Sequence, residues 1–128
     1  MKKYVFVLLL LAGSSTLMAQ ELPSVSPRSY EFYQVTTIES VVPAGLGRSR
    51  MLIRDENGRQ EELKMENFFS AVGINFGNIM SNEAAIGIKI QQLSDQGWEL
   101  YDTVGGVYSA DQSTGIFITR YLFRRIKK

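Results

Sequence analysis

The sequence predicts an α+β fold, in which an antiparallel sheet of three to five strands carries one main helix packed across it. Three observations support this prediction. Residues 30–42 are rich in aromatic and β-branched side chains, which favours a strand. The Asn57-Gly58 dipeptide is a strong hairpin signal. Residues 81–96 have apolar positions at helical spacing between capping residues, and two strand-like runs follow them.

Residues 1–19 have the layout of a secretory signal peptide. Lys2 and Lys3 form a positive start, residues 4–12 are apolar, and small residues lead to Ala19, near which we expect cleavage. The apolar run is about half of the ~20 residues that a membrane-spanning helix needs. We therefore expect an exported chain, periplasmic or secreted, with no transmembrane segment in its mature part.

The mature chain is expected to form one domain. Residues 20–29 contain two prolines and no hydrophobic period, which is typical of an extended lead-in. Residues 30–128 then form a single α+β domain. Within it, residues 43–81 are interpreted as an inserted hairpin and apolar segment.

The clearest local structure is a hairpin over residues 50–65. Both positions of a type I′ turn need positive φ, which Asn57-Gly58 favours. A two-residue turn there pairs Glu56 with Arg59, Arg54 with Glu61 and Leu52 with Leu63.

Residues 66–80 are the most apolar stretch of the mature chain and contain Phe68, Phe69 and Phe76. One interpretation is a short helix or turn whose aromatic rings complete the core. Another is an exposed apolar patch for a partner, or a small pocket with asparagine amides as its polar groups. The sequence leaves these alternatives open.

A helix is predicted over residues 81–96. Ser81 or Asn82 is the expected N-cap, Glu83 falls in the first turn, and Gly97 stands where a left-handed C-cap is expected.

Trp98 is predicted to be the centre of the core. It follows the helix end directly, and we expect it to pack against Ile90 and Leu93 of the helix and against aromatic side chains of the first and last strands. The last two strands are predicted over residues 98–108 and 115–126, joined as a hairpin. In the first of them, Leu100 and Val104 are expected on one face, and Gly105-Gly106 suggests a bulge or bend.

The chain resembles a small bacterial family of domains of unknown function. The resemblance rests on a Tyr-Glu-Tyr-Lys-Val-Val-type start at residues 30–35, a helix ending in Gly97-Trp98-Glu99-Leu100, and a Phe-Lys-Arg-type end at residues 123–125. Such families are short α+β domains with one helix across an antiparallel sheet. The resemblance implies a fold and carries no catalytic residues.

The composition excludes several kinds of chemistry. With no cysteine and no histidine, the chain has no disulfide, no thiol nucleophile, and no thiolate or imidazole metal ligand. A formal charge of +1 does not indicate nucleic-acid binding. Glu99 and Asp102, three residues apart on a strand, are expected on opposite faces and not as a carboxylate pair. We therefore expect no enzyme activity, no cofactor and no metal.

The function that remains is a non-catalytic module of the cell envelope that binds a protein partner or a second copy of itself. The alternatives are a small-ligand domain with a pocket between helix and sheet and, last, a carboxylate-based hydrolase. A basic C-terminus also allows docking on an anionic envelope surface. The candidate partner-surface residues are Phe68, Phe69, Phe76, Arg124, Arg125, Lys127 and Lys128.

Overall fold

The computed structural model describes residues 28–43, 46–109 and 115–128, so the predicted signal peptide lies outside the described residues. The described elements, in chain order, are β1 (Tyr30–Ser40), β2 (Arg50–Arg54), β3 (Gln60–Lys64), β4 (Phe69–Ser70), β5 (Gly73–Ile74), α1 (Phe76–Asp95), β6 (Glu99–Ser109) and β7 (Gly115–Ile126).

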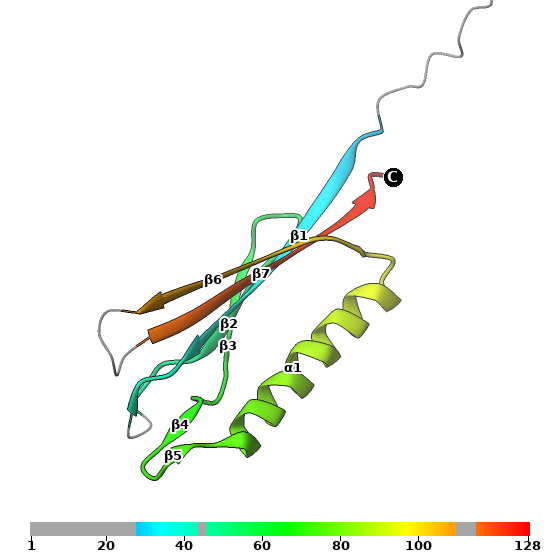
Figure 1. Ribbon diagram of the computed structural model, residues 1–128. Coiled ribbons are helices and arrows are strands. Elements are labelled where there is room, and N and C mark those ends of the chain that lie inside the picture. The colour runs from blue at the N-terminus through cyan, green and yellow to red at the C-terminus, as the bar shows by residue number, and fades with distance from the viewer. Residues whose placement is uncertain (1–27, 44–45, 110–114) are drawn as a thin grey trace, which may run out of the picture.

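Five of the strands form one antiparallel sheet in the order β3-β2-β1-β7-β6, and β4 pairs with β5 in a separate two-stranded sheet. Figure 1 shows the large sheet as one twisted layer, with α1 to one side of it. The α+β prediction is therefore confirmed at the level of one helix and an antiparallel sheet. The β2–β3 hairpin, which belongs to the predicted insertion, extends the sheet beyond β1.

The core joins side chains of the sheet and of α1. Trp98 is 4% exposed, and its ring centroid lies 5.4 Å from that of Tyr33 on β1. Aromatic rings at this separation interact favourably, so Trp98, which follows the helix, packs directly against the first strand. The buried apolar cluster consists of Val35, Met51, Ile53, Met65, Ile86, Leu93, Trp98 and Phe123, with Tyr33, Ile90 and Tyr121 packed against it.

The hairpin differs from the predicted one by one residue in register. Arg54 pairs with Gln60, and the Asp55 N–H donates to the Arg59 carbonyl, so the predicted pairing of Arg54 with Glu61 is wrong. The Asp55 carboxylate accepts hydrogen bonds from the N–H groups of Asn57 and Arg59 at 3.0 and 2.8 Å. These bonds stabilise a three-residue loop with Gly58 at φ 80°, where the prediction had a two-residue turn.

The register shift changes which side chains are buried. Met51, not Leu52, lies opposite Leu63, and Met51 and Ile53 are buried. Leu52 is on the opposite face of the sheet and is exposed. A one-residue slip has this effect because successive side chains of a strand point to opposite faces.

The helix begins five residues earlier than predicted, at Phe76. Its N-cap is Asn75, whose side chain accepts a hydrogen bond from the Asn78 N–H at 3.2 Å, so Ser81 and Asn82 are not caps. The prediction of a left-handed cap at the C-terminal end of the helix agrees with the structure, because Gly97 has φ 81° directly after the last turn. Only glycine adopts this left-handed conformation without strain.

The bulge in β6 lies at Tyr101, not at the predicted Gly105-Gly106. Leu100 pairs with Phe123 and Asp102 pairs with Leu122, so the residues after the bulge change faces. As a result, Leu100 and Val104 lie on opposite faces, against the prediction.

The same bulge corrects the prediction for the two acids of β6. Glu99 lies opposite Arg124 and Asp102 opposite Leu122, which places both acids on one face of the sheet. Glu99 is bound to Arg124 at 3.2 Å, and Asp102 accepts from the neighbouring Thr103 N–H at 2.8 Å, so each has a different partner.

Candidate functional site

The two edges of the large sheet differ in length and charge. β3, at one edge, has five residues and carries Glu61, Glu62 and Lys64. β6, at the other edge, has eleven residues, and no charged residue stands between Thr103 and Ser109. Proteins protect free edges by keeping them short and charged, which describes β3 and not the second half of β6.

The ladder shows which main-chain groups of β6 face outward. The Val41 N–H donates to the Gly115 carbonyl, and the Lys127 N–H donates to the Ser29 carbonyl, so odd-numbered residues of β7 bond to β1. In an antiparallel sheet alternate residues bond to opposite neighbours. The even-numbered residues of β7 therefore bond to β6, where their partners from Asp102 on are also even-numbered. The main-chain groups of Gly105 and Val107 consequently point away from the sheet.

One outward N–H of β6 already has an acceptor. The Thr103 N–H donates to Asp102 Oδ1 at 2.8 Å. An aspartate that bonds the backbone in this way competes with an incoming strand. The open part of the edge is therefore the short segment from Val104 to Tyr108.

The described residues give no steric or conformational reason for the two glycines in the middle of this segment. Neither has a positive φ. An added Cβ would meet no atom within 4 Å at Gly106, and only the Thr119 hydroxyl at 4.0 Å from Gly105. Glycine weakens a strand interior, and it is found where another backbone approaches closely.

The side chains around the glycines are apolar and exposed. Val104 is 54% exposed, Val107 68% and Tyr108 64%. Val104 and Tyr108 share one face of the sheet and Val107 is on the other. We define the β6 edge as residues 104–108; it presents main-chain donors and acceptors between apolar side chains on both faces.

The aromatic residues predicted as a partner surface are separated by the fold. Phe68 is half-buried, with its ring centroid 5.7 Å from that of Phe117, and Phe69 is half-buried in β4. Phe76 is 72% exposed at the first position of α1. The three residues therefore do not share one environment.

The two predicted basic residues on β7 are paired with acids. Arg124 binds Glu99 at 3.2 Å, and Arg125 binds Glu31 at 2.8 Å and Glu56 at 3.3 Å. Adjacent residues of a strand point to opposite faces, so the two guanidinium groups do not form one patch.

The guanidinium groups of Arg124 and Arg125 also make cation–π contacts with aromatic rings. The Arg124 guanidinium lies 4.2 Å from the Tyr101 ring centroid, and that of Arg125 lies 4.2 Å from the Trp98 ring centroid. The side chains of Lys127 and Lys128 are exposed, and they are the basic residues of the C-terminus outside these contacts.

The interior contains one buried acid among the described residues, Glu39. Burial raises the pKa of its carboxyl group; the hydrogen bond from Asn82 lowers it and the nearby Glu83 raises it. A raised carboxyl pKa is a property of acid catalysts, but a carboxylate hydrolase pairs such an acid with a second, ionised carboxylate. Within the described residues, no cluster of three or more acids is placed to hold a metal ion.

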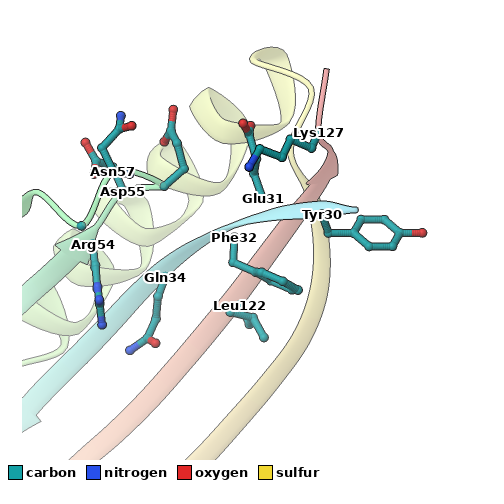
Figure 2. A pocket seen from close by; sticks show the side chains of 11 residues that line it. Tyr30, Glu31, Phe32, Gln34, Arg54, Asp55, Asn57, Leu122 and Lys127 are labelled. Atoms are coloured by element: carbon teal, nitrogen blue, oxygen red, sulfur yellow. Dashed lines mark hydrogen bonds between the residues drawn. The ribbon is translucent and has the colours of Figure 1, made fainter. Parts of the chain in front are cut away.

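Shallow hollows lie along the strands of the described part of the chain. The one in Figure 2 has a volume of about 490 Å³ and lies beside β1, where β2 has ended. Phe32 and Leu122 point to one side of β1, and Glu31 and Lys127 to the other (Figure 2). A hollow whose lining faces both sides of a sheet is an open notch. Two similar hollows have volumes of about 460 and 510 Å³. The first is lined mainly by β2 and β3, and the second by the residues between α1 and β6, the start of β1 and the end of β7.

Comparisons with protein-family models, curated proteins and solved structures found no match. The resemblance to a bacterial family of unknown function therefore stays a prediction. None of the described helices is long and apolar enough to cross a membrane.

The β6 edge was not among the residues predicted for the site. The sequence does contain its signal, an uncharged run from Thr103 to Ser109 with two glycines. What the sequence lacks is the strand order, which alone makes β6 an edge.

Proposed function

We propose that the chain is a non-catalytic interaction module of the cell envelope, and that it binds a protein partner by strand addition at the β6 edge. The observation that carries this proposal is the contrast between the charged β3 edge and the uncharged β6 edge. In strand addition, main-chain hydrogen bonds supply affinity and side chains on alternate faces supply specificity. Gly105 and Val107 offer the main-chain groups, and Val104 and Tyr108 offer the side chains.

The remaining features are consistent with this role. We propose that α1 packs across the sheet at β1, β2 and β7, since Ile86 and Leu93 share the buried cluster with Val35 and Phe123. A helix in that position leaves β6 uncovered, and every residue of β6 is exposed. From the predicted signal peptide we propose that the module acts outside the cytoplasm.

The test removes one outward N–H from each edge of the sheet. In Gly105→Pro, proline takes away a donor that faces away from β7, so the ladder with β7 is kept. In the matched control, Gln60→Pro, the lost donor is on β3. The Arg59 carbonyl accepts from the Asp55 N–H, so Arg59 bonds toward β2. Because alternate residues of a strand bond to opposite sides, the N–H of the next residue, Gln60, faces outward.

The measurement is capture of envelope proteins by the immobilised chain and its two variants, with circular dichroism to show that each variant is folded. We expect a captured protein to be lost with Gly105→Pro and kept with Gln60→Pro. Equal capture by a folded Gly105→Pro chain contradicts strand addition at β6. Loss with Gln60→Pro alone would assign the interaction to the other edge.

A further inference from the structure

We infer that the strand added to the β6 edge is β6 of a second copy of this chain, in antiparallel orientation with Gly106 opposite Gly106. This inference rests on the proposed function and names its partner. The two copies would form one continuous ten-stranded sheet around a two-fold axis, the commonest symmetry of homo-oligomers.

Charge favours the antiparallel arrangement. The acids of β6, Glu99 and Asp102, are both at its N-terminal end, and the strand is uncharged from Thr103 on. Parallel pairing would place each acid beside its copy, and like charges directly opposite are destabilising. Antiparallel pairing places the acids of the two copies at opposite ends of the contact. The nearly equal numbers of basic and acidic residues also cause little repulsion between copies.

Main-chain geometry restricts the register. The outward groups of the edge are on odd-numbered residues, so only these form hydrogen-bonded pairs between copies. The Thr103 N–H is already bound to Asp102, which leaves Gly105 and Val107. Pairing Gly105 of each copy with Val107 of the other makes two hydrogen-bonded pairs, which use the outward N–H and C=O groups of both residues in both copies. This register places Gly106 on the axis.

The side chains are complementary in the same register. Val104 of each copy lies opposite Tyr108 of the other, on the face of the sheet that both share. A β-branched residue opposite an aromatic one is a favourable cross-strand pair, and it covers two side chains that are more than half exposed in one copy. The absence of a side chain at Gly106 leaves room for the two Tyr108 rings to lean over the axis.

The absence of cysteine from the chain makes a cross-linking test unambiguous. Gly106→Cys places two thiols in a non-hydrogen-bonded pair, where the Cα atoms are about 4.5 Å apart and within disulfide range. We expect this variant to form a disulfide dimer about tenfold faster than Gly105→Cys, whose thiols are offset along the strands. Chains with Val104→Cys and chains with Tyr108→Cys should cross-link when mixed and much more slowly when each is alone.

Sedimentation velocity of the unmodified chain over a range of concentrations supplies the second readout. A monomer at every concentration together with slow cross-linking of Gly106→Cys overturns the inference. Faster cross-linking of Gly105→Cys overturns the register. If the chain is monomeric while capture of an envelope protein still depends on Gly105, strand addition stands with a different partner. If the chain is monomeric and no capture depends on Gly105, both the proposed function and this inference are wrong.

Discussion

Asn82 of α1 donates a hydrogen bond from Nδ2 to Oε1 of Glu39 on β1, over 3.0 Å. The same amide also bonds both main-chain groups of Glu66, accepting from its N–H and donating to its carbonyl at 2.9 Å each. Asn82 is 1% exposed and Glu39 7%. A single side chain therefore joins the helix, the first strand and the segment after β3.

Replacing this amide is expected to be costly. Asn82→Ala leaves a buried carboxyl group and two main-chain groups without their partner, and we expect the free energy of unfolding to fall by about 2–4 kcal/mol. Urea denaturation measures it. The matched helix control is Gln91→Ala, which loses one exposed hydrogen bond to Asp95 and should change stability by less than about 0.5 kcal/mol. Similar losses in both variants would contradict the role given to Asn82.

Stability is expected to depend on pH through Glu39. Because burial raises the pKa of this carboxyl group in the folded state, the folded chain holds the proton more tightly than the unfolded chain. The contribution is fully present below the ordinary glutamate pKa of about 4.3 and is lost as the pH rises through the folded-state pKa.

We therefore expect Glu39→Gln to remove this decline while keeping an oxygen that accepts from Asn82. The measurement is the free energy of unfolding of both proteins between about pH 4 and pH 8. The difference between variant and wild type should shift in favour of the variant as the pH rises. A difference that is constant with pH would show that Glu39 titrates alike in both states.

Two glycines of the helix region are expected to respond in opposite ways to alanine. Gly97 has φ 81°, and alanine in this conformation costs about 1–2 kcal/mol. Gly87 lies inside α1, and an added Cβ there meets no atom within 4 Å. Gly87→Ala should therefore stabilise the chain by about 0.5–1 kcal/mol. Thermal unfolding of both variants checks the prediction, and a stabilising Gly97→Ala would contradict the left-handed cap.

Arg125 is expected to matter for stability more than its neighbour Lys127. Arg125→Met loses the contact with the Trp98 ring and the ion pairs with Glu31 and Glu56, which together contribute about 1–2 kcal/mol. Lys127→Met should change stability by less than about 0.5 kcal/mol. The part due to the ion pairs should shrink in denaturation experiments at high salt. Equal effects of the two substitutions would contradict this assignment.

Amide exchange should alternate along β6 in dilute solution. The N–H groups of Gly106 and Tyr108 face β7, and those of Gly105 and Val107 face the edge. We expect the first pair to exchange about a hundredfold more slowly than the second, as measured by NMR. Thr103 should be intermediate because Asp102 accepts its N–H. Uniform exchange along the strand would mean that β6 is not held in this register.

The fold class was predictable because its signals are local. The final strand lies at residues 115–126, as its run of β-branched and aromatic residues indicates. The hairpin register was not predictable from Asn57-Gly58 alone, because the Asp55 carboxylate favours a longer loop. The early start of α1 was hidden by its glycines, Gly77 and Gly87.

The candidate site was predictable only in part. Trp98 at the helix end and the uncharged run after Thr103 are both readable from the residues. Whether that run lies inside the sheet or at its edge depends on which strand pairs with β7, and that pairing joins residues far apart in the chain. For the same reason, the acids that bind Arg124 and Arg125 were not identifiable from sequence spacing.

The asymmetry between the two sheet edges also limits how far an assembly grows. A chain with two open edges adds copies at both and forms fibres. Here the proposed pairing would use the open edge of each copy and leave a β3 strand, with Glu61, Glu62 and Lys64, at either end of the sheet. The proposed assembly through β6 would therefore terminate at two copies, with the short charged β3 strand of the β2–β3 hairpin as the stop.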